Sequence, residues 1–219
     1  MKDFIKNLIT IILPVLFVGT SNTANARIKR DRVDIVENMH FYVGAGIGYS
    51  FYNLNNEFEY RAEFVNHGTV TRHSLGLSGP VVGVKFQSLY GFGLELGYSI
   101  SEPLDMYGNQ NGELSIRNIF LDFMNYRPLA IDLDDVKFEI LAGVGIGHMA
   151  MREHGSIGAL GADDGYKKYG LRAKVGGQYN IDNHWSVRGL VSYQKVGPRS
   201  GLNGINSAKV VSLDVIYVI

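Results

Sequence analysis

The sequence predicts an all-β protein, an eight-stranded antiparallel up-and-down β-barrel, and three observations lead to this prediction. Eight segments alternate apolar residues with small or polar ones, and a period of two is that of side chains along a β-strand. Glycine is abundant, with 27 of 219 residues, but there are only five prolines, so the composition is not that of a flexible linker. Long and short connections largely alternate between the segments, as in barrels with two different ends.

The first predicted strand, residues 41–50, reads FYVGAGIGYS and resembles a phosphate-binding loop at first sight. A dinucleotide-binding fingerprint needs a third glycine three positions after the second. Tyr49 stands at that position here, and His148 stands there in the second glycine run, AGVGIGHMA. We therefore assign both runs to strands in which one face is apolar and the other is small.

Seven further segments follow the same alternation, and none of the chain competes as a long helix. The predicted strands span 79–87, 91–100, 115–123, 137–147, 168–179, 185–193 and 210–219. The predicted long, polar loops are roughly 51–75, 101–113, 151–165 and 194–208. The connections after the second and sixth strands are tight, and the one after the fourth is intermediate.

The apolar faces are predicted to point outward, toward lipid, which makes the barrel a transmembrane one. Aromatic residues gather at both ends of the strands, with Val, Ile, Leu and Ala between them. Near the short turns they are Phe41, Phe86, Phe92, Phe123, Phe138, Tyr179, Trp185 and Tyr217, and near the long loops Tyr49, Tyr98, Tyr169 and Tyr193. Two aromatic girdles around an aliphatic band match the two interfaces of a membrane. A soluble lipocalin-like carrier with its apolar face inside is the alternative.

The opposite face carries four basic and four acidic residues among its glycines. A small barrel has an interior that side chains fill, and buried charges persist when they are paired. We therefore expect an ion-pair network that plugs the lumen and leaves no wide pore, with the glycines making room for long neighbours. Its predicted members are Lys85, Glu95, Asp122, Glu139, Arg172, Lys174, Arg188 and Asp214.

The N-terminus predicts export. Two lysines precede the apolar stretch 8–19, and Ala24-x-Ala26 offers a cleavage site, as in a signal peptide. The stretch is shorter than the ~20 residues of a spanning helix. We expect a cleaved signal peptide at 1–26, a periplasmic tail at 27–39 and the barrel at 40–219. The chain has no Cys, which excludes disulfides, and equal numbers of acidic and basic residues, which give no reason to expect a nucleic-acid partner.

With these features, residues 40–219 resemble the small eight-stranded outer-membrane barrels of Gram-negative bacteria, namely the OmpA-type transmembrane domain and OmpX- and Opa-like surface proteins. The resemblance rests on strand pattern and loop layout. It implies a location in the cell outer membrane, periplasmic termini, four exposed loops, insertion by the barrel-assembly machinery, and contact with outer-membrane lipid and lipopolysaccharide. The chain departs from many such barrels in ending on Tyr217-Val-Ile219 rather than on Phe or Trp, and no peptidoglycan-binding domain is expected after the last strand.

The expected role is that of a surface protein, structural or adhesive, with no enzymatic activity and no cofactor. Loops on a rigid scaffold commonly carry function, so the first long loop is the candidate surface for a host or environmental ligand. Its candidate binding residues are Phe58, Tyr60, Arg61 and Phe64.

Two other functions compete with this one. A lipid A-modifying, deacylase-like enzyme would use His154 and Ser156, whose spacing of two puts both on one face of a strand. A narrow or gated conductance is the other. The six histidines show no metal-ligand spacing, and no metal site is expected.

Overall fold

The computed structural model describes residues 39–54, 69–86, 91–107, 112–129, 137–155, 166–197 and 205–219. Eight long strands build the barrel: β1 (Met39–Leu54), β3 (His73–Phe86), β4 (Phe92–Ser101), β6 (Gly112–Pro128), β7 (Phe138–Gly155), β8 (Tyr166–Asn180), β9 (Trp185–Val196) and β10 (Ile205–Val218). Two short strands, β2 (Thr69–Val70) and β5 (Leu104–Tyr107), accompany them. Among the residues described, no helix is both long and apolar enough to cross a membrane.

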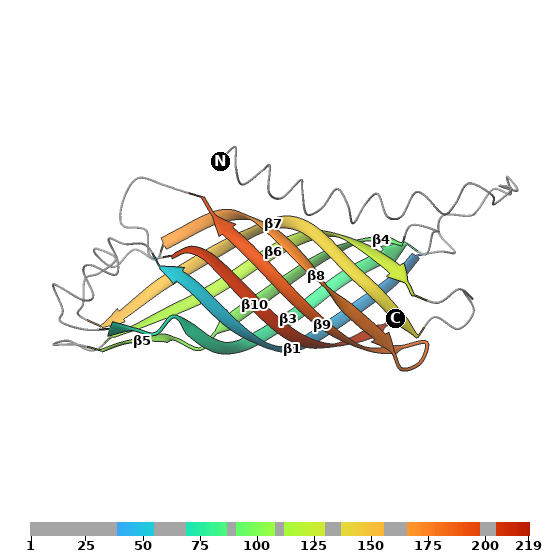
Figure 1. Ribbon diagram of the computed structural model, residues 1–219, viewed down its shortest axis with the longest axis horizontal. Helices are drawn as coiled ribbons and strands as arrows, with labels where there is room; N and C mark the ends of the chain where they lie inside the picture. Colours follow the sequence, from blue (N-terminus) through green and yellow to red (C-terminus); the bar gives the residue numbers. More distant parts are fainter. Residues whose placement is uncertain are drawn as a thin grey trace, which may run out of the picture. The chain divides into compact units, whose positions relative to one another are not determined.

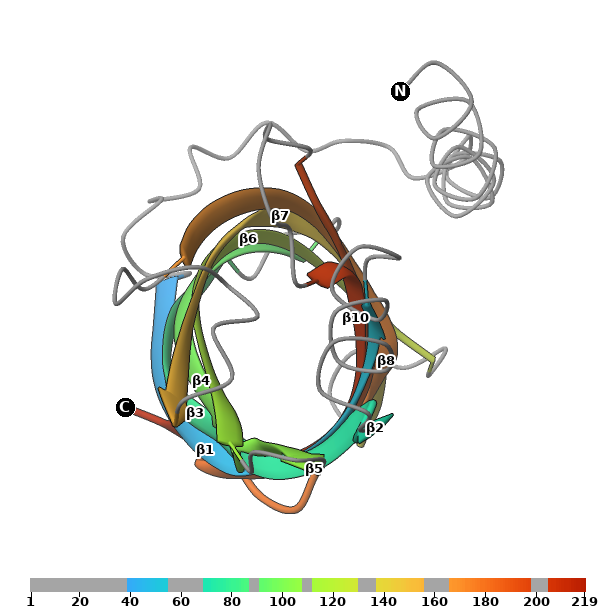
Figure 2. The same ribbon diagram turned by 90° about the vertical axis from the view of Figure 1, so that its left-hand side faces the viewer.

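The barrel closes between the first and last long strands. Around the ring the order is β6-β4-β3-β1-β10-β9-β8-β7, and β7 pairs with β6 to complete it. Every pairing is antiparallel, and β1 pairs with β10 from Tyr42↔Val218 to Leu54↔Ile205. Figure 1 shows the strands crossing the barrel at a slant, and Figure 2 shows them as a ring around a lumen. The predicted closed eight-stranded antiparallel barrel is confirmed.

The two ends of the barrel differ. At one end, which we call the turn end, Val218 N donates to His184 O at 2.7 Å and Ile219 N donates to Phe41 O at 2.8 Å. The turn 181–184 between β8 and β9 also lies there. In it, Asp182 Oδ1 accepts hydrogen bonds from the backbone N–H groups of His184 (2.8 Å) and Trp185 (2.7 Å). These two hydrogen bonds lower the pKa of the Asp182 carboxyl.

At the opposite end, the loop end, the strands run further than predicted. β1 continues to Leu54, β3 begins at His73, β6 begins at Gly112 and β7 ends at Gly155, so the predicted loop boundaries there were wrong. β5 pairs with the start of β6, and β2 pairs with β5. Backbone pairing thus continues past the point at which the outward residues become polar. At the turn end β1 starts at Met39, one residue before the predicted barrel boundary.

The middle of each strand presents its apolar side chains outward, as predicted. Ile47, Leu96 and Leu213 are 54%, 53% and 55% exposed, although large apolar residues are usually buried. We call this surface the apolar belt; its members include Val43, Ile47, Val82, Leu94, Leu96, Leu121, Ile140, Ile146, Leu171, Val175, Val191, Leu213 and Val215. Because the belt is present on all eight long strands, it encircles the barrel.

Toward the loop end the apolar and polar faces of the strands are exchanged. Here the inward side chains are apolar and buried, and form one cluster that we call the loop-end cap. Its members are Tyr52, Leu54, Leu104, Leu114, Ile116, Met149, Met151, Val196, Ile205 and Ala208. The outward neighbours of these residues are largely polar, for example Glu113, Arg117, Arg152 and Lys195. The loop-end segment therefore has the sidedness of a barrel in water, with its apolar residues inside.

Candidate functional site

The lumen beside the apolar belt is crossed by ion pairs. Glu95 of β4 pairs with Lys174 of β8 and with Arg188 of β9, and all three side chains are buried. Since β4 and β9 are four places apart in a ring of eight strands, the contact between Glu95 and Arg188 joins opposite walls. We call Glu95, Asp122, Arg172, Lys174 and Arg188 the central ion cluster.

Asp122 extends the central ion cluster toward the loop end. Its carboxylate lies 2.7 Å from Lys174 Nζ and 3.5 Å from Arg172 Nε. The Arg172 guanidinium lies over the Phe120 ring, with its Cζ 3.9 Å from the ring centroid. Lys174 thereby joins two carboxylates, Glu95 and Asp122, and its charge is shared between them.

Two tyrosines complete the central ion cluster, and sequence reasoning missed both. Tyr42 OH donates to Glu95 Oε2 at 2.9 Å, and the Tyr42 and Tyr126 hydroxyl oxygens are 2.8 Å apart. Arg188 lies over the Tyr42 ring at 5.2 Å. Their inward position in the strand alternation was the available signal, but the aromatic residues were assigned mainly to the outward girdles. An inward tyrosine fills space and supplies a hydroxyl to a buried carboxylate.

Lys85 and Glu139 form a separate pair nearer the turn end, with Lys85 Nζ 2.5 Å from Glu139 Oε1. Gln178 connects this pair to the central ion cluster: its Nε2 donates to Glu139 Oε2 at 3.4 Å, and its Oε1 accepts from Arg188 Nε at 3.1 Å. Seven of the eight predicted charges are thus ion-paired.

The eighth predicted charge, Asp214, lies apart from these pairs. It is buried on β10, and Ser212 Oγ donates to its Oδ2 at 3.2 Å. No ion pair within the described residues includes Asp214. Its Oδ2 therefore accepts from a hydroxyl rather than from a cation, and its buried Oδ1 has no hydrogen-bond partner in the described part of the chain.

The inward glycines give these side chains their space. A Cβ on Gly145 would collide with an Asp122 oxygen, and one on Gly83 would collide with the Tyr42 ring. A Cβ on Gly46 would come within 2.5 Å of Asp214 Oδ1. Real Cβ atoms do not approach other atoms so closely. The glycine runs that resemble phosphate-binding loops are thus the packing partners of large inward side chains.

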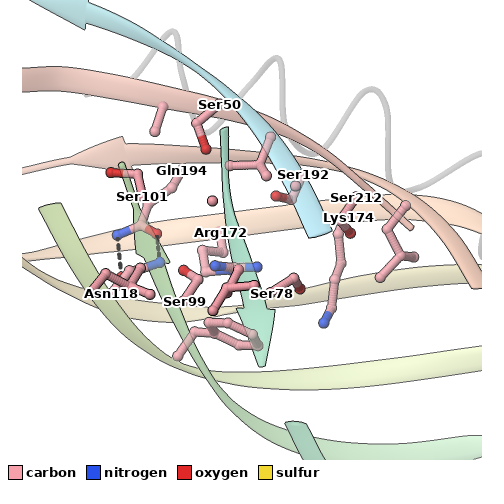
Figure 3. Close-up of a pocket in the computed structure, with 18 of the residues that line it drawn as sticks. Ser50, Ser78, Ser99, Ser101, Asn118, Arg172, Lys174, Ser192, Gln194 and Ser212 are labelled. Atoms are coloured by element: carbon pink, nitrogen blue, oxygen red, sulfur yellow. Dashed lines mark hydrogen bonds between the residues drawn. The ribbon is translucent and has the colours of Figure 1, made fainter. Parts of the chain in front are cut away.

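A cavity with a mixed lining of polar and apolar side chains lies between the central ion cluster and the loop-end cap (Figure 3). Its volume is about 60 Å³, enough for a few waters. Asn118 and Gln194 both line it and hydrogen-bond to each other, with Asn118 Nδ2 and Gln194 Oε1 2.8 Å apart. Its hydroxyl lining comes from Ser50, Ser78, Ser99, Ser101, Ser192 and Ser212. Hydroxyls at this density suit water or a very small polar solute.

The other predicted site residues fall largely outside the described residues. This holds for Phe58, Tyr60, Arg61, Phe64 and Ser156, as it does for the predicted signal peptide 1–26 and most of the tail. The backbone of His154 belongs to β7, where it is the register partner of Glu113 on β6. Within the described part of the chain, no group of three His, Asp or Glu side chains is placed to hold a metal ion.

Comparison with solved structures identifies the architecture. The crystal structure of Ail, the attachment invasion locus protein of Yersinia pestis, matches with a TM-score of 0.50 at 11% identity, covering 82% of this chain and 98% of that one. The fold is that of the small outer-membrane β-barrels. Neisserial surface protein A (NspA) matches with a TM-score of 0.50 at 13% identity, covering 81% and 96%, and the outer membrane protein OprG of Pseudomonas aeruginosa with 0.50 at 15%, covering 82% and 95%.

No protein-family model matches the sequence, and no curated protein matches it. At identities of 11–15% the solved structures establish the fold alone. Function has to be argued from the faces and the lumen of the barrel.

Proposed function

We propose that the protein is an outer-membrane barrel exposed at the cell surface, with a structural or adhesive role and no chemistry of its own. The observation that carries this proposal is the apolar belt, which leaves side chains such as Ile47 and Leu213 more than half exposed around the whole ring. A surface of this kind is stable in lipid and unfavourable in water. The belt also counts against a soluble lipocalin-like carrier, whose apolar face would line the lumen.

The surface role is supported by the architecture of the loop end. The strands extend past the apolar belt there, so they would carry the connecting loops clear of the membrane. Ail, which shares the fold, is an attachment invasion locus protein. We assign the loop-borne residues Phe58, Tyr60, Arg61 and Phe64 as the contact surface for a host or environmental ligand, because a rigid barrel presents loops in a fixed arrangement.

The lumen supports a closed barrel rather than a channel. The central ion cluster joins opposite walls, and the loop-end cap fills the other end with side chains that are 0–7% exposed. Both layers would have to move before an ion could pass. We therefore expect no stable large conductance in planar bilayers, which counts against a narrow or gated pore.

A lipid A-modifying enzyme remains the competing function, since His154 and Ser156 are two residues apart. Only the backbone of His154 belongs to the described residues, so the arrangement offers this function no geometric support. Lipid A from expressing cells, analysed by mass spectrometry, should be unchanged; a change that disappears in Ser156→Ala would establish catalysis instead.

The first experiment is electrophoresis of the membrane-fraction protein in SDS, unheated and boiled. A closed barrel resists SDS until it is heated, so the two samples should migrate differently. A protein found in the soluble fraction with no mobility shift would overturn the proposed outer-membrane location.

The adhesive role is tested by counting expressing cells bound to epithelial monolayers, for the wild type and for a variant with Phe58, Tyr60 and Phe64 changed to Ser. Equal adherence of the wild type and the variant would refute the adhesive role of these residues, so that only the structural role would remain.

A further inference from the structure

The outward face of the barrel carries an unexplained set of basic residues at the loop end. Five neighbouring strands, β6 to β10, each contribute one, and all five side chains are exposed. We call them the basic arc: Arg117, Arg152, Lys167, Lys195 and Lys209. The lumen chemistry does not use them, because they lie on the opposite face of the sheet.

The position of each base along its strand is not random. On β8 the outward residues run Leu171, Tyr169, Lys167, and on β9 they run Val191, Tyr193, Lys195. On β10 and β6, Lys209 and Arg117 likewise follow the last outward apolar residue, and on β7 Arg152 follows Ala150. The basic arc therefore borders the apolar belt on the side of the loops.

The residues inside the barrel also change character at the height of the basic arc. The loop-end cap begins near the same height, where Ile116 adjoins Arg117 and Val196 adjoins Lys195. The sidedness of the barrel changes there from apolar-out to apolar-in. Such a reversal is expected where the surrounding solvent changes from hydrocarbon to water, which is the depth of the lipid head groups.

At the level of the basic arc the outward strand positions are basic on one side of the barrel only, although Arg72, just before β3, is also exposed. At the corresponding outward positions, β1 has Asn53, β3 has His73 and β4 has Glu102. A general requirement for basic residues at the interface would affect all eight strands alike. The confinement to five adjacent strands favours one extended contact.

The basic arc also has its charges available. No ion pair within the described part of the chain involves any of the five residues. A Lys or Arg beside an apolar surface packs its methylene stem on that surface and holds its charge at the polar boundary. Five such charges in a row attract an anionic surface.

We propose that the basic arc binds the phosphate groups of lipid head groups in the outer leaflet, the phosphorylated lipid A of lipopolysaccharide. The inference rests on the proposed outer-membrane location. Continuity with the apolar belt identifies a lipid rather than a soluble anion, since the acyl chains lie against the belt while the phosphates meet the bases. Arg117 and Arg152 suit bidentate contacts to phosphate oxygens, and the lysines act as point charges.

The test uses the full chain in detergent micelles with a triple variant, Lys167→Gln, Lys195→Gln and Lys209→Gln. Gln keeps much of the side-chain length and removes the charge. The control variant, Glu102→Gln directly after β4, removes an exposed charge of the other sign at the same end of the barrel, next to a strand outside the basic arc. The probes are bis-phosphorylated lipid A and the same lipid A after removal of its phosphates, and bound lipid is counted by native mass spectrometry.

The wild type and the control variant should bind phosphorylated lipid A equally. The triple variant should bind it about 10- to 100-fold more weakly, and dephosphorylated lipid A should bind weakly to all three. Equal binding by the triple variant, or equal binding of both lipids by the wild type, would overturn the proposal. Heat-dependent mobility in SDS separates the failure of the basic-arc proposal from the failure of the proposed outer-membrane location. If the triple variant shows the mobility shift and still binds lipid A as the wild type does, only the basic-arc proposal is refuted. If the wild type shows no mobility shift, the outer-membrane location is refuted and the basic-arc proposal with it.

Discussion

Two segments of the same strands are built on opposite rules. Beside the apolar belt, the lumen is charged, as at Glu95 and Arg188, and the outside is aliphatic, as at Leu96. In the loop-end segment, the lumen is apolar, as at Leu114, and the outside carries charges such as Lys195. The backbone pairing is continuous through both. The comparison teaches that hydrogen bonding fixes the sheet, while the surrounding solvent decides which face is apolar.

The largest expected effect comes from breaking the charged lumen. Glu95→Gln removes the carboxylate shared by Lys174 and Arg188 and leaves a buried excess of positive charge. Removing one partner of a buried ion pair costs about 3–5 kcal/mol. The free energy of unfolding, measured by urea titration in detergent micelles, should fall by that amount. Glu113→Gln, on the exposed outer face, is the control, and an equal loss in both variants would contradict a structural role for the central ion cluster.

Leu114→Ala tests the other kind of lumen. Leu114 is fully buried in the loop-end cap, and deleting its methyl groups leaves a cavity. Such truncations cost about 2–5 kcal/mol in a packed core. The same urea titration should show the loss, and planar-bilayer recording should still show no stable conductance because the central ion cluster remains. A stability within about 0.5 kcal/mol of the wild type would mean that the cap is loosely packed.

The sequence predicted the belt segment well and the loop-end segment poorly, for a physical reason. Around Leu96 and Glu95 the alternation of apolar and charged residues matches a strand with lipid on one side. Around Leu104 and Met151 the chain reads as polar loops, because charged residues and nearby Gly, Asn and Pro residues interrupt the apolar alternation. The long β6–β7 ladder that turns these stretches into strands pairs residues distant in sequence, such as Gly112 and Gly155, and so has no local signature. β5 pairs with β6 as a short hairpin inside a stretch that was predicted to be a loop.

Within the candidate site, the members of the ion network were predictable but their partners were not. Four bases and four acids on one face implied pairing, yet the sequence did not indicate that Lys174 bridges two carboxylates or that Asp214 accepts from a serine. Those outcomes depend on which strands stand on opposite walls. They depend equally on the space left by glycines such as Gly145.

The outward faces of the two segments are compared by two substitutions, one that places a charge in the apolar belt and one that places an apolar residue in the loop-end segment. Leu96→Arg places a charge in the apolar belt and should cost about 2–4 kcal/mol near the bilayer midplane. Lys195→Leu, outward in the loop-end segment, should change the free energy of unfolding by less than about 0.5 kcal/mol. Reversible unfolding in lipid vesicles measures both. Equal tolerance at the two positions would contradict the assignment of the belt to lipid.

A smaller effect is expected from filling the space beside one lumen carboxylate. Gly145→Ala would press a methyl group against Asp122 and against the Leu121 carbonyl oxygen, and overpacking costs about 1–3 kcal/mol. Gly189 is the matched control, since a Cβ there meets nothing within 4 Å. Gly189→Ala should leave the free energy of unfolding unchanged or slightly higher. Gly145 faces the lumen and Gly189 faces outward, so similar results from both would refute the packing role.

The smallest effect belongs to the turn end, outside both segments. The two hydrogen bonds to Asp182 lower its pKa, so the ionised carboxylate is favoured in the folded protein. Its contribution to stability is therefore present above the unfolded-state pKa of about 4 and is lost as the pH falls through the lowered folded-state pKa. Asp182→Ala should reduce the urea midpoint slightly at pH 7, and this difference from the wild type should shrink on acidification. Asn183→Ala, in the same turn, should show no such pH dependence. A difference for Asp182→Ala that grew as the pH fell would mean that the carboxyl acts in its protonated form, because only a group with a raised pKa stabilises the folded state more at low pH.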